Sequence, residues 1–256
     1  MYGTIIQDAY RIDEAQEIIA ALDDICNPND NIGWASAGLY CFWNYYTREI
    51  LYIGLTVDLT QRFKQHHGFM KTTKTGSKLK NIKEYFQSYE KIGYSILVQS
   101  PLDQPVTAKN IYNLFGYDPT EYKLKQFSNE TSKVNLKHVE GILIEAYRRF
   151  HGNIPPWNKA DGSKEGREQT TDGNYKLVEL FKTDSSSPLV SKFSLRQLSS
   201  VPHFEGIESF LHGARQYMLR MGITYGQSLE LLKKADIGNR FADLESIGYD
   251  KIKLTI

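Results

Sequence analysis

Two short apolar runs of the sequence each carry a tyrosine whose phenol could take part in proton transfer. Tyr40 lies in the run 38–44, GLYCFWN, and Tyr52 lies in the run 50–55, ILYIGL. Aromatic and β-branched residues favour strands, and the short polar connection between the two runs predicts a β-hairpin. If the hairpin closes symmetrically around Tyr46, the two phenols lie opposite each other on one surface of the sheet.

The segment after this hairpin places a guanidinium and an imidazole on one face of an expected helix. Residues 56–68, TVDLTQRFKQHHG, have helical character, with Thr56 or Asp58 as the N-cap. Arg62 and His66 are four residues apart and therefore share a face. A guanidinium and an imidazole on one face can bind a phosphate from one side.

Three further residues could contact a substrate near these groups. Gly54 shares a face with the second tyrosine, and its missing side chain allows close approach to the backbone. Lys78 and Lys80 lie at the start of a second expected helix, 77–93, and ammonium groups there would attract anions. A third strand is expected over 94–100, YSILVQS.

The helix expected over 135–150 carries two carboxylates in different positions. Its apolar stripe consists of Leu136, Val139, Leu143, Ala146, Tyr147 and Phe150. Glu140 lies at the margin of this stripe, where a carboxylate is costly unless it is paired or binds a cation. Glu145 falls on the opposite, solvent-facing side, where Arg148 and Arg149 can pair with it. We therefore expect Glu140 to be the cation ligand, and Glu145 is the alternative if the helix is phased differently.

The rest of the chain gives weaker signals. Asn158, in the segment IPPWNKADG, is of a residue type that commonly caps turns. Turn signals over 101–134 indicate an insertion. The other expected elements are helices over 12–25, 205–220 and 226–235, a strand pair over 176–194 and a short strand over 251–256.

Composition is that of an ordinary globular protein. The chain has 256 residues, of which 41% are hydrophobic and 24% charged. The absence of an apolar run of 18 residues predicts no membrane span, and the first residues lack the pattern of a signal peptide. Cys26 and Cys41 form neither a metal-binding pattern nor a disulfide framework, which suits a reducing compartment such as the cytoplasm.

Charge is distributed unevenly along the chain, although the net charge is only +1. Residues 1–35 hold seven acidic residues and one basic residue, a net charge of −6. Residues 36–160 hold 17 basic and 10 acidic residues, a net charge of +7. The basic excess therefore coincides with the candidate residues, and it favours a polyanionic partner.

Taken in order, these motifs resemble the GIY-YIG nuclease family. The resemblance rests on Gly38-Leu39-Tyr40, Tyr52-Ile53-Gly54, the Arg-x-x-x-His step, a helix glutamate and Trp157-Asn158, and it covers residues 36–160. Leu39 stands where the family has isoleucine, an exchange of one apolar residue for another. The interval from Glu140 to Asn158 is longer than usual in the family. Glu140 is still preferred to Glu145, because its local sequence, Glu-x-x-Leu-Ile, matches the family pattern.

The resemblance implies an α/β (α+β) core with a three-stranded antiparallel sheet flanked by helices. It also implies hydrolysis of phosphodiester bonds in double-stranded DNA with one divalent metal, magnesium or manganese. Glu140 would hold the metal, and Tyr40 would activate the attacking water with Tyr52 beside it. Arg62 and His66 would stabilise charge on the phosphate. Asn158 would brace the site.

This reading divides the chain into three parts. Residues 1–35 would form an acidic helical extension, residues 36–160 the nuclease core with an insertion at about 101–134, and residues 175–256 an α/β or helical subdomain for DNA recognition or oligomerisation. A bacterial or phage-infected cell is the expected setting, with restriction, homing and phage roles all open. One site per chain leaves a homo-oligomer open as the way to cut both strands. The alternative function is a DNA-binding regulator that keeps the scaffold and does not cleave.

Overall fold

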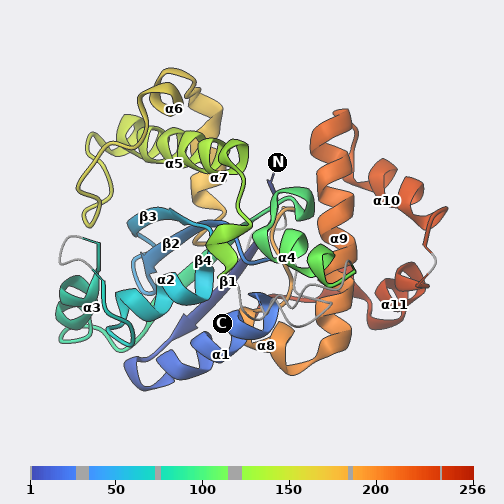
Figure 1. Cartoon of the computed structure of the whole chain (residues 1–256), viewed down its shortest axis with the longest axis horizontal. Helices are drawn as coiled ribbons and strands as arrows, with labels where there is room; N and C mark the ends of the chain where they lie inside the picture. The colour runs from blue at the N-terminus through green and yellow to red at the C-terminus, as the bar shows by residue number, and fades with distance from the viewer. Residues whose placement is uncertain (1, 27–34, 73–75, 115–122, 184–186, 237) are drawn as a thin grey trace.

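A four-stranded antiparallel sheet forms the centre of the protein, as seen in the computed structural model, which describes residues 2–26, 35–72, 76–114, 123–183, 187–236 and 238–256 (Figure 1). The strands are β1 (Tyr2–Tyr10), β2 (Gly38–Asn44), β3 (Ile50–Thr56) and β4 (Ile92–Gln99). Their order across the sheet is β1-β4-β2-β3, so β3 is an edge strand. The mixed α/β class is as predicted, but the sheet has four strands rather than three.

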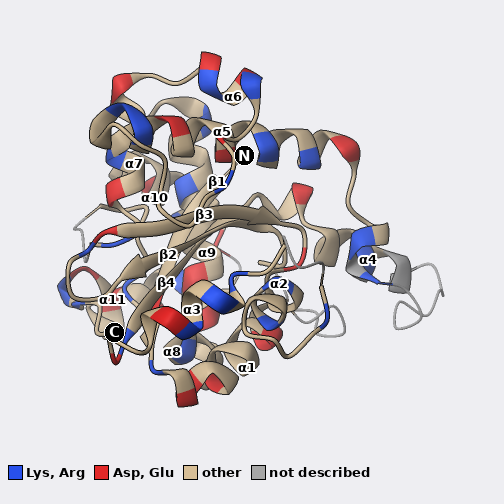
Figure 2. Cartoon of the chain, turned by 90° about the vertical axis from the view of Figure 1, so that its left-hand side faces the viewer, with Lys and Arg blue, Asp and Glu red and all other residues tan. Residues whose placement is uncertain are grey.

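Helices cover both faces of this sheet. The longer ones are α1 (Ala15–Cys26), α2 (Leu59–His66), α3 (Leu79–Tyr85), α4 (Pro105–Leu114), α5 (Glu130–His151), α9 (Pro202–Met221), α10 (Tyr225–Lys233) and α11 (Arg240–Ile247). The short ones are α6 (Lys164–Glu168), α7 (Tyr175–Glu179) and α8 (Leu195–Ser200). Figure 2 shows α5, α6 and α7 on one side of the sheet and α1, α2, α3 and α8 on the other. None of the helices in the described part of the chain is long and apolar enough to cross a membrane.

Strand β2 shows why this sheet is buried on both faces. Tyr40 and Phe42 belong to the hydrophobic cluster under α1, α2 and α8, whereas Leu39, Cys41 and Trp43 belong to the cluster under α5 and α7. All seven residues of β2 are buried. A strand covered on both faces needs apolar residues at successive positions, which accounts for the continuous run GLYCFWN.

The expected helical extension over residues 1–35 is half wrong, because its first part is strand β1. Its residues pair with β4 from Tyr2↔Gln99 to Tyr10↔Ile92. The polar side chains inside this strand find partners far away in the sequence: the Gln7 amide donates to the carbonyl oxygens of Leu180 and Thr183, and Asp8 accepts from Arg196. Such long-range partners cannot be read from local sequence. The break expected after the helix over 12–25 lies mostly in residues 27–34, outside the described residues.

The three strands expected in the C-terminal part are also wrong. Residues 175–179 form α7, which packs Val178 against the second cluster, and residues 187–194 contribute only one isolated parallel bridge, Ile5↔Val190. Residues 184–186, in the middle of that expected strand pair, lie outside the described residues. Residues 251–256 have no strand partner, since Tyr249–Lys251 is a 3-10 helix and the following residues are irregular.

Two of the helices that carry candidate residues, α2 and α5, are confirmed with adjusted ends, whereas the helix expected over 77–93 is confirmed only over Leu79–Tyr85, because β4 already begins at Ile92. Asp58 caps α2, because its side chain accepts a hydrogen bond from the Gln61 amide at 2.8 Å. Helix α5 begins at Glu130 rather than 135, because Asn129 caps it by accepting from the Ser132 amide. The expected insertion over 101–134 contains α4, and residues 115–122 within it lie outside the described residues.

Candidate functional site

Three of the predicted residues meet at one phenolic oxygen. Arg62 Nε donates a hydrogen bond to Tyr40 Oη at 3.0 Å, and His66 Nε2 lies 2.8 Å from the same oxygen. Tyr40 comes from β2, and the other two residues come from one face of α2, as their four-residue spacing predicted. The phenol of Tyr40 is thus held at the junction of sheet and helix.

A backbone amide determines which nitrogen of His66 carries the proton. The amide of Lys78 donates to His66 Nδ1 at 3.0 Å, so Nδ1 is an acceptor. Burial lowers the pKa of His66 from 6.5 to about 2, with Arg62 as the next cause, so the ring is neutral. A neutral ring with an accepting Nδ1 has its hydrogen on Nε2, which therefore donates to Tyr40.

Tyr40 Oη consequently receives two hydrogen bonds from nitrogen donors. Donors stabilise the charged phenolate, whereas burial opposes it. Burial is the larger influence and raises the pKa of Tyr40 well above its usual value, Tyr52 raises it further, and Arg62 acts against both. The site therefore contains a buried phenol whose donors are already arranged around its oxygen.

The second phenol, Tyr52, lies next to the first, although the predicted hairpin register was wrong. Tyr40 pairs with Gly54, and Phe42 pairs with Tyr52, because the turn closes from Asn44 to Glu49 and the register shifts after Phe42. The rings of Tyr40 and Tyr52 nevertheless lie 5.7 Å apart between centroids. Tyr52 is 9% exposed and Tyr40 is 1% exposed, so Tyr52 is the more accessible phenol.

Gly54 makes room for a protein side chain. A Cβ atom at Gly54 would lie 2.7 Å from Tyr40 Oη and 2.7 Å from the Tyr52 ring. Any larger residue would therefore displace the two phenols. The space that Gly54 leaves was expected to admit a ligand, but Tyr40 fills it. Gly54 therefore affects the site by making room for the two tyrosines.

Lys78 is buried inside the site. Its Nζ donates to the Trp157 carbonyl oxygen at 2.5 Å and lies 4.4 Å from the centroid of the Tyr52 ring. Burial lowers the pKa of Lys78 to about 8, with the charges of Lys159 and Arg62 as further causes. With its amide on His66 and its ammonium on the Trp157 carbonyl, Lys78 ties α3 to the segment that precedes Asn158.

Asn158 braces the exposed edge of β3. Its Oδ1 accepts from the Ile53 amide at 3.0 Å, and its Nδ2 donates to the Ile53 carbonyl oxygen at 2.8 Å. The Trp157 amide also donates to the Leu51 carbonyl oxygen at 2.8 Å. Side chain and backbone together replace a neighbouring strand and fix β3 on both sides of Tyr52.

Glu140 reaches the same edge from the opposite face of the sheet. The Leu55 amide hydrogen-bonds its carboxylate, and Arg62 is close enough for its charge to act on it. Burial is the larger influence and raises the pKa of Glu140 from 4.5 to about 7. Glu140 forms no ion pair within the described residues. It is therefore a carboxylate at an incompletely neutralised position, which a divalent cation could occupy.

Glu145 is paired as predicted but buried, contrary to the prediction that it faces solvent. Its carboxylate accepts from Arg148 Nε and Arg149 Nε, both at 2.8 Å, and its side chain is 4% exposed. The arginines lie over it and exclude water. This carboxylate has two cations of its own, so it is the weaker candidate for a metal ligand.

Sequence reasoning missed two members of the site. Gln65 accepts from Arg62 Nη1 at 3.0 Å and so orients the guanidinium; it lies three residues after Arg62, the helical spacing that could have indicated the contact. Tyr94, opposite Phe42 in β4, buries a hydroxyl that has no hydrogen-bond partner within the described residues. A strand over 94–100 was predicted, but its pairing with β2 could not be read from the sequence.

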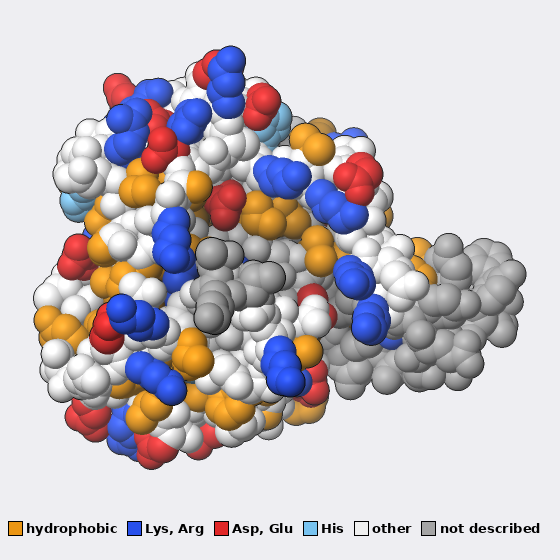
Figure 3. All heavy atoms as spheres, turned by 60° about the vertical axis from the view of Figure 1, so that its left-hand side comes forward, with side chains coloured by type: hydrophobic (Ala, Val, Ile, Leu, Met, Phe, Trp, Pro, Cys, Tyr) orange, Lys and Arg blue, Asp and Glu red, His pale blue; other side chains and the backbone are white. Residues whose placement is uncertain are grey.

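Lys80 lies outside this cluster, on the surface of α3. Its side chain is 87% exposed and forms an ion pair with Glu84 at 3.6 Å. On the face shown in Figure 3, Lys and Arg side chains lie around the middle of the view, with hydrophobic side chains between them. Lys80 thus belongs to the molecular surface, whereas Lys78 belongs to the buried cluster.

The described residues hold no group of three or more His, Cys, Asp or Glu side chains that could bind a metal ion. A site built from them would have Glu140 as its one carboxylate and water as the remaining ligands. Mg²⁺ fits such a site, since it keeps several of its waters and binds through one or two carboxylates. No family model, no curated protein and no solved structure matches this chain.

Proposed function

We propose that this protein is a metal-dependent DNA endonuclease of the GIY-YIG type, which hydrolyses phosphodiester bonds. The observation that carries the proposal is the convergence of Arg62 Nε and His66 Nε2 on Tyr40 Oη, together with a carboxylate, Glu140, on which the charge of Arg62 acts and which has no ion pair within the described residues. These are the groups that hydrolysis of a phosphodiester requires: a base for water, cations for the phosphate and a ligand for a metal.

Arg62 would bind the phosphate through its guanidinium, because this residue is only partly buried. Nε donates to Tyr40 and Nη1 donates to Gln65, which fixes the guanidinium in place beside Tyr52. A guanidinium fixed by two protein contacts loses little freedom when a phosphate oxygen binds. Its charge would then offset the negative charge that grows on the phosphate during attack.

The two tyrosines would act as a pair on the attacking water. Tyr52 is the more exposed phenol, and it interacts with both Tyr40 and Arg62. The phenolate form of this pair, which Arg62 Nε and the Nε2–H of His66 stabilise, would accept a proton from the water and become a neutral phenol, leaving hydroxide as the nucleophile. The water oxygen then bonds to phosphorus while the bond from phosphorus to the leaving oxygen breaks.

Glu140 is the residue that would hold Mg²⁺ or Mn²⁺. When bound, such an ion polarises the phosphate and stabilises the leaving oxygen. Glu140 fits this role because its carboxylate is only partly buried, and its pKa of about 7 falls when a cation approaches. Asn158 would contribute indirectly, by holding the β3 edge on which Glu140 rests.

The proposal is tested by magnesium-dependent nicking of supercoiled plasmid and genomic DNA from several sources. We expect Glu140→Gln to lower the cleavage rate by about 10³-fold or more, a barrier increase of roughly 4 kcal/mol. Glu145→Gln is the matched control, because it removes a carboxylate from the same helix that already has two arginine partners. Its cleavage rate should stay within a few-fold of wild type.

Equal losses in the two variants would reject Glu140 as the metal ligand. A wild-type protein that binds DNA but cuts none of the substrates with Mg²⁺ or Mn²⁺ would instead favour the non-cleaving regulator. In that case Glu140→Gln should leave DNA affinity unchanged.

A further inference from the structure

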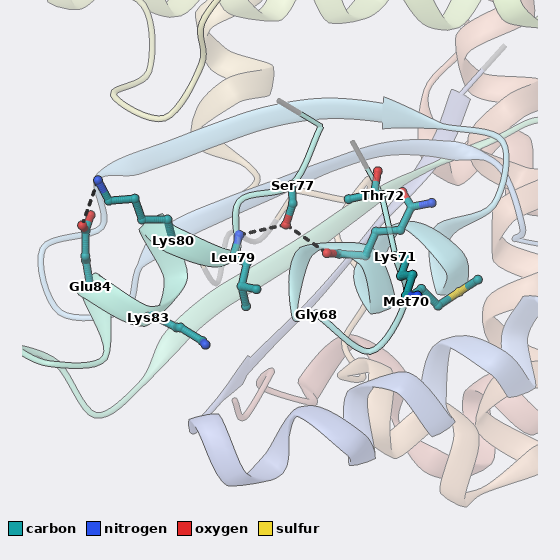
Figure 4. Close-up of a pocket in the computed structure, with 10 residues that line it drawn as sticks. Gly68, Met70, Lys71, Thr72, Ser77, Leu79, Lys80, Lys83 and Glu84 are labelled. Atoms are coloured by element: carbon teal, nitrogen blue, oxygen red, sulfur yellow. Dashed lines mark hydrogen bonds and ion pairs between the residues drawn. The ribbon is translucent and has the colours of Figure 1, made fainter. Parts of the chain in front are cut away.

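A groove opens beside the candidate site, between the end of α2 and the start of α3. It has a volume of about 600 Å³ and is lined from both sides of this junction (Figure 4). Gly68, Met70 and Leu79 supply apolar lining, and Lys71, Lys80 and Lys83 supply charge. A cavity of this size can accept one or two nucleotide units of a strand.

The charge of the groove has one sign with a single exception. Lys71, Lys80 and Lys83 are exposed, and among the described lining residues only Glu84 is acidic. Lys80 pairs with Glu84 at 3.6 Å, whereas Lys71 and Lys83 form no ion pair within the described residues. A surface pair of this kind is worth at most about 1 kcal/mol, so a phosphate could readily displace it.

The wall of the groove is built from the segments that position the site. Gln65 lines the groove and accepts from Arg62 Nη1, while its backbone carbonyl accepts from Ser77 Oγ at 3.0 Å. Lys78, which follows Ser77 in the sequence, donates its backbone amide to His66 Nδ1. A strand that runs through the groove would therefore contact Gln65, the residue that holds the guanidinium of Arg62.

We propose that this groove binds the sugar–phosphate backbone of one DNA strand next to the phosphate that is cut. Lys71, Lys80 and Lys83 contact phosphates, and the apolar lining packs against a sugar. This inference rests on the proposed function, and it adds to it the path of the strand. Contacts of this kind read no bases, so the groove contributes affinity for any DNA sequence.

The test is DNA binding measured by fluorescence anisotropy in EDTA, where no cleavage occurs, over a series of salt concentrations. The test variant is Lys71→Ser/Lys80→Ser/Lys83→Ser. Each lost phosphate contact reduces the slope of log affinity against log salt by about 0.9, so three contacts reduce it by about 2.7. We also expect roughly tenfold or greater weakening of binding at low salt.

The matched control is Lys164→Ser/Lys176→Ser/Lys234→Ser, which removes the same net charge from exposed positions on other helices. Lys164 forms an i,i+4 ion pair with Glu168 at 3.7 Å, so it reproduces the pairing of Lys80. This control should keep the wild-type salt slope. Similar slopes in the two triple variants, or no DNA binding by wild type, would overturn the groove proposal.

Cleavage in Mg²⁺ separates this inference from the proposed function. A wild-type protein that cuts DNA, together with a groove variant of unchanged salt slope, rejects the groove and leaves the nuclease proposal intact. A groove variant with the reduced slope, together with a wild-type protein that never cuts, supports the groove as a DNA-binding surface and rejects the nuclease.

Discussion

Two buried clusters of this molecule contain an arginine, a glutamate, a histidine and a tyrosine but connect them differently. The candidate site holds Arg62, Glu140, His66 and Tyr40 between sheet and helices. A second cluster, which we call the α9 cluster, holds Arg215, Glu208, His212 and Tyr249 next to β1. The same side-chain chemistry thus occurs twice in one chain.

In the α9 cluster the charged side chains form an ion pair with each other. Arg215 Nη1 lies 2.7 Å from Glu208 Oε2, and both side chains are fully buried. Tyr249 donates to the same carboxylate, and Arg215 Nη1 also donates to Thr4 Oγ1 of β1 at 2.9 Å. Every charge has its counter-charge inside the protein, so this cluster ties the C-terminal helices to the sheet.

In the candidate site the arginine and the glutamate remain apart. Arg62 donates to Tyr40 and Gln65, and Glu140 receives a backbone amide from β3. Both residues are only partly buried. A closed buried ion pair is costly to break and has nothing left to offer a ligand, whereas separated charges at a partly open position can bind one.

The largest effect on stability should come from breaking the ion pair between Arg215 and Glu208. Glu208→Gln leaves the guanidinium of Arg215 buried without a counter-charge, which costs about 3–5 kcal/mol. Urea denaturation followed by circular dichroism would measure this loss of unfolding free energy. A change below about 1 kcal/mol would show that the α9 cluster does not hold the fold together, and the contrast between the clusters would fail.

Tyr40→Phe should give the next largest effect, on the proposed cleavage activity. It removes the acceptor of Arg62 Nε and His66 Nε2 without changing the ring packing. We expect the cleavage rate to fall by about 10²–10³-fold, or roughly 2.7–4 kcal/mol. Tyr249→Phe is the matched control, since it also removes a buried hydroxyl; it should lower stability and leave the specific activity of the folded protein unchanged.

Helical spacing predicted half of the candidate site well, because local geometry alone determines it. Arg62 and His66 share a face at a separation of four residues, and Glu145 meets Arg148 and Arg149 for the same reason. Tyr40 and Tyr52 also lie beside the pair of Arg62 and His66 in the structure, whereas Lys80 lies apart from it on the surface.

Strand partners were the part that the sequence could not supply. Strand β1 carries Gln7 and Asp8 at buried positions, and their partners lie about 170 or more residues away. The hairpin register depends on the Asn44 side chain, which accepts from the amides of Tyr46 and Thr47 and so shapes the turn. A symmetric closure assumed from spacing misses both effects, since each depends on side-chain contacts formed in three dimensions.

The two buried histidines should make similar contributions to pH-dependent stability despite their different networks. Burial, the largest cause in each case, lowers the pKa of His212 to about 3 and that of His66 to about 2. Each folded-state pKa lies below the unfolded value of 6.5, so this stability is present above pH 6.5 and is lost as the pH falls below it. Each histidine should cost about 2 kcal/mol between pH 7.5 and pH 5.

Urea denaturation of wild type, His212→Gln and His66→Gln at the two pH values measures these contributions. Each variant should lose about the same part of the wild-type pH dependence. If the change in unfolding free energy between the two pH values became smaller in one variant only, the histidine replaced in the other variant would be protonated in the folded protein. The hydrogen bonds assigned to that histidine would then need revision.

The smallest effect should be the stability change in Glu140→Gln, and it is the most direct comparison with Glu208→Gln. The two substitutions make the same chemical change, but Glu140 has no ion pair within the described residues, so its loss leaves no buried cation unpaired. A neutral amide of similar shape also avoids the cost of burying a carboxylate charge, which raises the pKa of Glu140 to about 7. In EDTA at pH 8 we expect the unfolding free energy to change by less than about 1 kcal/mol, or to rise. If Glu140→Gln instead lost as much stability as Glu208→Gln in the same urea titration, Glu140 would be a structural residue like its counterpart, and a metal would have no vacant carboxylate to bind.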